Sequence, residues 1–133
     1  MANIRRTVYL LAGLSLIISM VGCSSSRKKD PALQLRVQRV QATLTDITAA
    51  VEKYNEDRGY LPKGMATLRD AGYLSIMPDL EREWSFKYFT DGGRVMMVEA
   101  VSRAAMPDGE GYRMIYRVPD QNFEGYGITE FPQ

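Results

Sequence analysis

The 133-residue sequence contains no histidine, and this absence excludes several kinds of functional site. A Ser-His-Asp triad, a Cys-His pair and a histidine-ligated zinc all need an imidazole side chain. An excess of charge of one sign is also lacking, because 17 lysines and arginines stand against 16 aspartates and glutamates. This balance gives no electrostatic reason to expect nucleic acid as a partner. We therefore expect one domain that is not an enzyme and does not bind nucleic acid.

Cysteine occurs once, at Cys23, where an apolar run ends and a polar one begins. The first six residues include two arginines and no acid, and residues 7–22, TVYLLAGLSLIISMVG, are almost wholly apolar. A positive segment followed by an apolar run of this length predicts a secretory signal. As a helix the run would span about 24 Å, short of the roughly 30 Å of a bilayer core. A permanent membrane-spanning helix is the alternative interpretation.

Residues 20–23, Met-Val-Gly-Cys, resemble the lipobox of bacterial lipoproteins, although that family usually has leucine where Met20 stands. The resemblance implies cleavage before Cys23 and acylation of Cys23 as the new N-terminus, which anchors the chain in the membrane. The alternative is a buried free thiol, the commonest state of a lone cysteine. Ser24 follows in place of the aspartate that marks inner-membrane retention in this family. In a Gram-negative cell this implies the outer membrane, facing the periplasm.

These features divide the chain into three parts. Residues 1–22 are expected to be a lipoprotein signal peptide, and residues 23–30 a lipidated cysteine with a polar tether. Residues 31–133 remain for a folded head.

The head is expected to begin with a long helix over residues 31–57. Asp30 followed by Pro31 is typical of a helix start, and Gly59 of a helix end. Apolar residues recur at alternating spacings of four and three, so they share one stripe: Leu33, Val37, Val40, Leu44, Ile47, Val51 and Tyr54. The stripe predicts either a coiled-coil seam between chains or one amphipathic helix covering a sheet. The second is favoured, because a sheet follows.

The rest of the head changes from helical to strand periodicity. A short second helix is expected at residues 65–71, before Gly72. Alternating apolar and polar residues then predict antiparallel strands, with a hairpin turn at Asp91-Gly92: residues 84–88, 94–103 and 112–118, with a short fourth strand around Tyr126 and Ile128. This order predicts the α+β class, with a three- to four-stranded antiparallel meander.

The stretch 47–78, ITAAVEKYNEDRGYLPKGMATLRDAGYLSIMP, resembles the head of type II secretion pseudopilins and type IV pilins. Those proteins have a similar run of Tyr, Asp-x-Gly, Pro, Leu and Gly-Tyr-Leu between a long helix and a small antiparallel sheet. The resemblance implies a pilin-like head in which Leu68 and Tyr73 hold the short helix against the long one. The prepilin cleavage site and the polymerising apolar helix of pilins are missing, so an ordinary filament subunit is not expected.

A calcium site is a candidate near the C-terminus. Asp120, Asn122 and Glu124 place oxygen ligands at alternate positions before Gly125, as at the start of a calcium loop. Major pseudopilins bind calcium in a C-terminal loop, so the resemblance adds interest. The twelfth position is Phe131 rather than glutamate. A polar loop before the last strand is the alternative, with no cofactor.

Three further groups have a functional and a structural interpretation. The eight methionines suggest thioether copper ligands. Adjacent Met96 and Met97 would point to opposite faces of a strand, however, so gap-filling core residues are the favoured interpretation of the methionines. Glu81 and Glu83 suggest an acid–base pair, but a charged turn is favoured.

The aromatic side chains of the strands form the third group. They suggest a binding platform, but alternate strand positions favour a core beneath the long helix: Trp84, Phe86, Tyr88, Tyr112 and Tyr116.

The function expected from these features is a non-catalytic protein-interaction or scaffold role at the cell envelope. The partners would be the membrane, through acylated Cys23, and envelope proteins, including components of a secretion or pilus system. A small-ligand-binding module is one alternative. A structural oligomer that self-associates through the 31–57 helix is the other.

Overall fold

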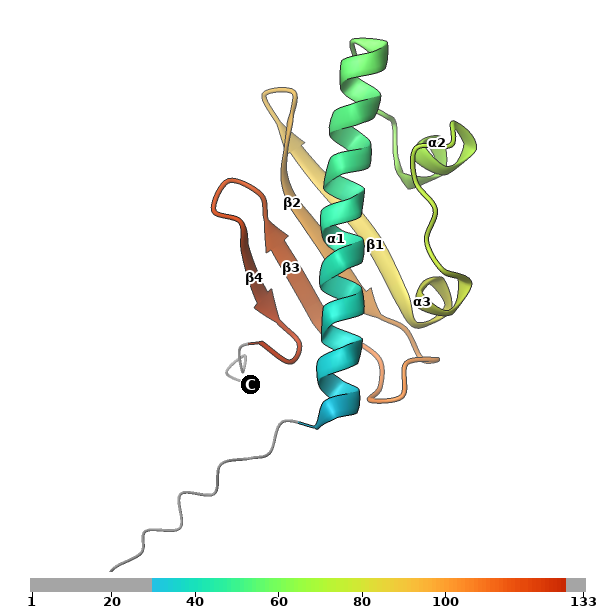
Figure 1. Cartoon of the computed structure of the whole chain (residues 1–133), viewed down its shortest axis with the longest axis vertical. Coiled ribbons are helices and arrows are strands. Elements are labelled where there is room, and N and C mark those ends of the chain that lie inside the picture. Colours follow the sequence, from blue (N-terminus) through green and yellow to red (C-terminus); the bar gives the residue numbers. More distant parts are fainter. Residues whose placement is uncertain (1–29, 129–133) are drawn as a thin grey trace, which may run out of the picture.

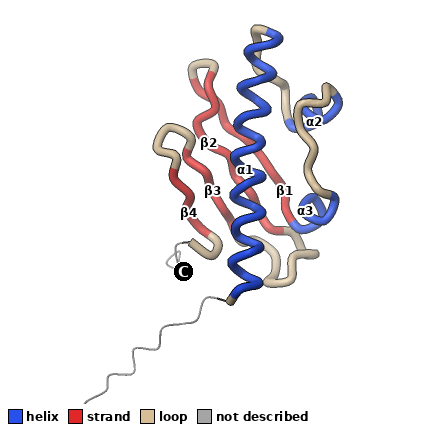
Figure 2. The backbone as a smooth tube through the Cα atoms, viewed as in Figure 1, coloured by secondary structure: helices blue, strands red, loops and turns tan. Residues whose placement is uncertain are grey.

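A computed structural model describes residues 30–128 of the chain, and Figures 1 and 2 show the arrangement. Three helices precede four strands: α1 (Pro31–Arg58), α2 (Met65–Asp70), α3 (Pro78–Glu83), β1 (Trp84–Asp91), β2 (Arg94–Ser102), β3 (Arg113–Arg117) and β4 (Asn122–Gly125). The strands form one antiparallel sheet in the order β1-β2-β3-β4. The predicted α+β class, with a long helix before an antiparallel meander, is confirmed.

Helix α1 begins and ends as its sequence predicts. Asp30 Oδ1 accepts a hydrogen bond from the Ala32 N–H at 2.9 Å, and Pro31 occupies the first helical position. At the other end the Gly59 N–H donates to the Asn55 carbonyl at 2.8 Å. The 28 residues give a rod of about 42 Å. Among residues 30–128, no helix combines the length and apolar character that crossing a membrane requires.

Helix α1 lies across one face of the sheet (Figure 1), and its apolar stripe belongs to the core formed with that sheet. The helix is therefore the cover of a sheet, the favoured one of the two interpretations. The largest side chains that are completely removed from solvent come from both layers and from α2: Trp84, Leu44, Ile47, Leu68, Met114, Val40, Val51 and Val98. This single core holds helix and sheet together through burial of apolar surface.

The segment between α1 and β1 lies beside the β1 edge of the sheet (Figure 2). Leu68 of α2 is fully buried, and the Tyr73 ring meets the Tyr54 ring edge-on, with centroids 5.2 Å apart. The Tyr88 hydroxyl donates to the Pro62 carbonyl at 2.7 Å, which fastens the segment to β1. The expected role of Leu68 and Tyr73 in holding the short helix is confirmed.

Helix α3 corrects the prediction of a charged turn around Glu81 and Glu83. The sequence contains two signals for this helix: Pro78 at its first position and acidic residues in its first turn. Burial of Leu80, which is 2% exposed, holds the short helix against the rest of the head. Glu81 is paired with Arg69 of α2 at 2.5 Å.

The fourth strand also lies elsewhere than predicted. It spans Asn122–Gly125, where Phe123 pairs with Tyr116 of β3, instead of lying around Tyr126 and Ile128. The turn before it is short because Gln121 adopts a left-handed conformation, with φ of 50°. Tyr126 follows the strand. Its side chain is buried, which is why an apolar residue here resembled a strand position in the sequence.

Candidate functional site

A groove of about 610 Å³ lies beside the C-terminal half of α1. Four separate segments build it: α1, the loop after α1, the β1–β2 hairpin and the turn after β3. We call it the distal groove, because it lies toward the end of α1 that is remote from the N-terminus of the chain. Its lining residues are Val51, Glu52, Asn55, Glu56, Leu61, Gly93, Arg94, Val95, Met96, Val118 and Pro119.

A β-bulge shapes the hairpin wall of the distal groove. Phe89 pairs with Met97 and Thr90 pairs with Val95, so Met96 is the extra residue of β2. The bulge turns Val95 toward the core, at 3% exposure, and leaves Met96 at 39% exposure in the groove wall. Bulges commonly re-aim side chains in this way. A backbone hydrogen bond joins β2 to the turn after β3 in this wall, because the Val118 N–H donates to the Met96 carbonyl at 3.0 Å.

This arrangement corrects the expectation that Met96 and Met97 are core residues. Met96 is exposed in the groove, and Met97 is half-buried on the sheet face turned away from α1. Neither belongs to the buried core.

The charges of the distal groove stand on opposite walls. Glu52 and Glu56 are exposed on α1, one helical turn apart, and Arg94 is exposed on the hairpin. Within residues 30–128, none of the three takes part in an ion pair. Like charges four residues apart repel each other on a helix. The groove lining thus combines two acidic side chains on its α1 wall, a basic side chain on its hairpin wall and several apolar side chains, an arrangement suited to binding.

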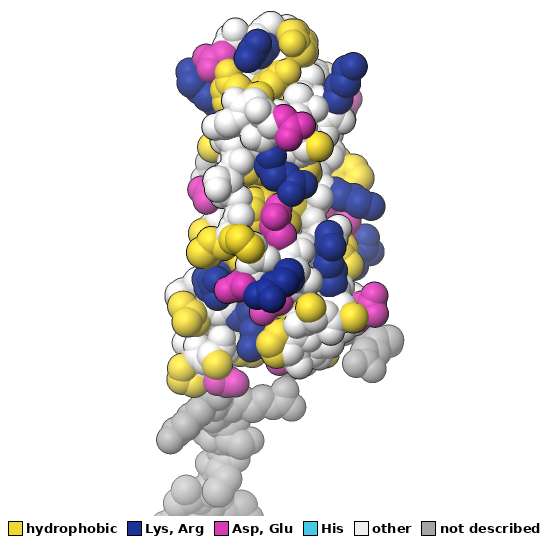
Figure 3. Space-filling model, turned by 90° about the vertical axis from the view of Figure 1, so that its right-hand side faces the viewer, with side chains coloured by type: hydrophobic (Ala, Val, Ile, Leu, Met, Phe, Trp, Pro, Cys, Tyr) yellow, Lys and Arg dark blue, Asp and Glu magenta, His cyan; other side chains and the backbone are white. Residues whose placement is uncertain are grey.

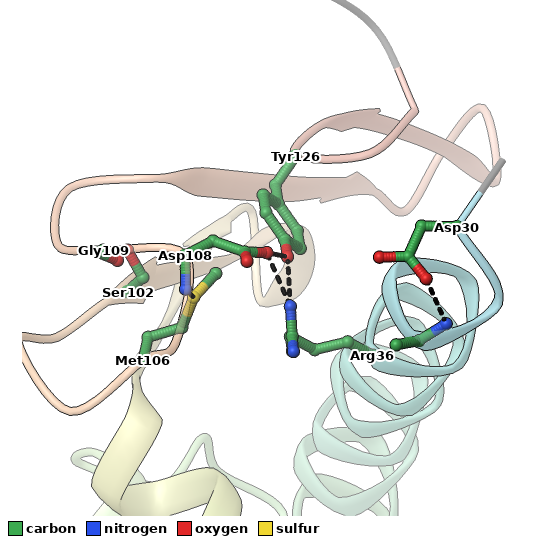
Figure 4. A network of polar contacts seen from close by, with 8 residues as sticks. Asp30, Arg36, Ser102, Met106, Asp108, Gly109 and Tyr126 are labelled. Atoms are coloured by element: carbon green, nitrogen blue, oxygen red, sulfur yellow. Dashed lines mark hydrogen bonds and ion pairs between the residues drawn. The ribbon is translucent and has the colours of Figure 1, made fainter. Parts of the chain in front are cut away.

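A polar network lies at the other end of α1, where it ties three elements together (Figure 4). The Arg36 guanidinium pairs with Asp108 at 2.6 Å and donates to the Tyr126 hydroxyl at 3.2 Å. The Tyr126 hydroxyl donates to the same Asp108 oxygen. Burial, with the hydrogen bond to Asp108, raises the pKa of Tyr126 to about 12, and the hydrogen bond with Tyr126 raises the pKa of Arg36.

The same end is braced by the loop between β2 and β3. The buried Ser102 hydroxyl donates to the Gly109 carbonyl and accepts from the Tyr112 N–H, both at 2.8 Å. The printed contacts join α1, the loop between β2 and β3 and the segment after β4, so this network explains how the loop is held.

The calcium candidates occupy a hairpin, not the expected polar loop before the last strand. Asp120 is in the turn between β3 and β4, while Asn122 and Glu124 are on β4 itself. The Glu124 carboxylate accepts a hydrogen bond from Arg117 at 2.8 Å, which raises the pKa of that arginine. Residues 30–128 contain no cluster of three or more acid or thiol side chains able to hold a metal ion.

The aromatic residues largely follow the core expectation. Trp84 is fully buried and its ring meets Tyr126 at 5.4 Å, while Phe86 and Tyr88 are partly buried. Tyr112 is the exception, at 45% exposure. None of the five lines the distal groove.

Other predicted features lie outside the groove or outside the described residues. Cys23, the signal segment and Phe131 are not among the residues that the structure describes. On the face shown in Figure 3, basic and acidic side chains are interspersed rather than gathered by sign. The sequence analysis did not predict the groove. A local signal for it was the presence of two glutamates four residues apart, Glu52 and Glu56, beside Val51.

Comparisons with known proteins give no match to a family model, to a curated protein or to a solved structure. Function therefore has to be inferred from the residues and geometry of this chain.

Proposed function

We infer that this protein is a lipid-anchored component of the cell envelope whose head is a non-catalytic interaction or scaffold module. Cys23 would be the acylated residue, and the outer membrane facing the periplasm the location in a Gram-negative cell. The head would present the distal groove to an envelope protein. The lipobox-like sequence before α1 motivates the anchor, and the order of helix and meander is in keeping with a pilin-like head beside a secretion or pilus machine.

The observation that carries this proposal is the position of the groove beside the C-terminal half of α1, whereas Asp30 stands at the other end of that helix. Asp30 is seven residues after Cys23, so an extended tether reaches at most about 25 Å. Helix α1 then runs for about 42 Å toward the groove. An anchor at Cys23 would hold one end of the helix near the bilayer and leave the groove at the other end open to a partner.

A small-ligand-binding role is the second candidate, because the groove volume of about 610 Å³ falls within the range of small-molecule sites. The oligomer built through α1 is less favoured. The apolar stripe that would form its seam is already buried on the sheet of the same chain.

Site-specific photo-crosslinking in cells tests the proposal. A photoreactive amino acid replaces Met96 in the groove of the full-length protein, and in a matched strain it replaces Lys87, which is exposed on the sheet face turned away from α1. We expect an envelope protein to be captured from position 96 and not from position 87. Mass spectrometry of the N-terminal peptide reports acylation of Cys23.

Cys23→Ser provides the control for the anchor. The variant should carry no acyl group, move out of the outer-membrane fraction and lose the cross-link at position 96. Equal capture from positions 87 and 96, or a Cys23→Ser protein that still fractionates with the outer membrane, would contradict the proposal.

A further inference from the structure

We propose that the distal groove binds an extended segment of a partner protein in which an apolar side chain lies between a basic and an acidic residue. This inference rests on the proposed interaction role and names the chemistry of the partner. It follows from the layout of charge and apolar surface across the groove, not from the groove volume.

The acidic wall selects the basic residue of the segment. Glu52 and Glu56 are exposed, repel each other across one turn of α1 and form no ion pair within the described head. A lysine or arginine placed between them would relieve that repulsion. The neighbouring Lys53 pairs with Asp57 at 2.8 Å, and Glu56 also helps to raise the pKa of Lys53, so Lys53 offsets part of that repulsion without forming an ion pair with either glutamate.

The hairpin wall selects the acidic residue. Arg94 stands on β2 across the groove from α1, and it too has no ion-pair partner among residues 30–128. Its guanidinium can take a carboxylate through two parallel hydrogen bonds. A ligand that contacts both walls should therefore carry a basic group for the α1 wall and an acidic group for the hairpin wall.

The strip between the walls selects apolar side chains. Leu61 and Val118 are partly buried there, and Met96 is 39% exposed because of the bulge. A flexible, polarizable methionine at a binding surface adapts to different apolar partners. In an extended peptide, successive side chains point to opposite faces with a rise of about 3.3 Å per residue, so a basic and an acidic residue three positions apart can face the two walls with apolar residues between them. Among residues 30–128, no aromatic side chain lines the groove for the stacking of a flat ligand.

The test is a set of double-mutant cycles read by NMR on the full chain purified in detergent. The probe is the peptide acetyl-Gly-Lys-Leu-Leu-Glu-Gly-amide. We expect it to shift the amide signals of Leu61, Met96 and Val118, with a dissociation constant of roughly 1 mM. Replacing the peptide lysine by glutamine should weaken binding about two- to fivefold, the range for exposed ion pairs.

The cycles decide whether the assigned walls are responsible. The lysine-to-glutamine peptide should lose no further affinity for the Glu52→Gln/Glu56→Gln protein, and the glutamate-to-glutamine peptide none for Arg94→Gln. Both protein variants change exposed residues, so their folding should be unaffected. The same losses in wild-type and variant proteins, or shifts elsewhere than at the groove, would overturn the proposal.

Two further outcomes would also overturn it. Groove signals that move with protein concentration alone would indicate a second copy as the occupant, and absence of any shift at millimolar peptide would exclude such a segment. These results are independent of the cross-linking experiment, so a failure of the groove chemistry can be told from a failure of the scaffold role.

Discussion

Gly127, two residues after the end of β4, lies close against α1. It has φ of 70°, and a Cβ atom at this position would overlap the Val37 Cγ2 methyl group. We expect Gly127→Ala to lower the free energy of unfolding by about 2–4 kcal/mol, because backbone strain and overpacking add. Gly72→Ala is the matched control, since Gly72 has a similar φ of 78° with open space around it. Gly72→Ala should lower the free energy of unfolding by about 1 kcal/mol. Equal losses for the two variants in urea denaturation would argue against the clash at Gly127.

Tyr126 makes the stability of the head depend on alkaline pH. The pKa of its phenol is raised from 10.0 to about 12 in the folded state, so folding favours the protonated form. This contribution is fully present below pH 10 and is lost as the pH rises toward 12. Tyr126→Phe should lower stability at neutral pH by about 1 kcal/mol, through the lost hydrogen bonds.

The pH profile separates Tyr126 from other groups. Tyr88 also has a raised pKa, caused by burial, so some loss of stability at high pH should remain in Tyr126→Phe. The gap between wild type and variant, followed by denaturation between pH 9 and about 12, should narrow as the pH rises. A constant gap would mean that ionisation of Tyr126 is not linked to folding.

At the scale of elements, α1 offers two leucines in opposite environments. Leu44 is fully buried against the sheet, whereas Leu35 is 59% exposed. Leu44→Ala should reduce the free energy of unfolding by about 2–5 kcal/mol, since it removes buried apolar surface and leaves a cavity. Leu35→Ala should change it by less than about 0.5 kcal/mol. Comparable losses from the two substitutions, measured by thermal and urea unfolding, would contradict the packing of α1.

The elements that the sequence predicted well are those with local signals. The stripe from Leu33 to Tyr54, with its proline start and glycine end, was sufficient for α1 because each signal lies within the helix or directly next to it. Helix α3 had a comparable start at Pro78, but its charged residues also suited a turn. The β4 strand was misplaced because buried Tyr126 resembled a strand residue, and only pairing with β3 decides the register.

The distal groove could not be predicted in the same way. Its walls come from segments as far apart in sequence as Val51 and Pro119. The bulge that exposes Met96 depends on the pairing of β1 with β2, which the alternation of residues within β2 does not reveal. The two glutamates were visible in the sequence, but their place beside an apolar strip required the tertiary fold.

At the scale of the whole molecule, we expect the head to be monomeric. The seam that a helical oligomer would use is buried within one chain, from Val37 to Tyr54. Sedimentation of the Cys23→Ser protein without the apolar segment 1–22 should give the mass of a single chain at high concentration. A concentration-dependent rise in mass would support the oligomer instead.

The placement of the two ends of α1 also has a mechanical consequence. The helix packs on the sheet through side chains along most of its length, whereas neighbouring strands are joined by backbone hydrogen bonds. A pull between an anchor at Cys23 and a partner in the distal groove would act nearly along the helix axis. Such a load would strain the whole helix–sheet interface in shear, and its contacts would have to fail together rather than peel apart turn by turn. The head would then serve as a tension-resistant link between membrane and partner.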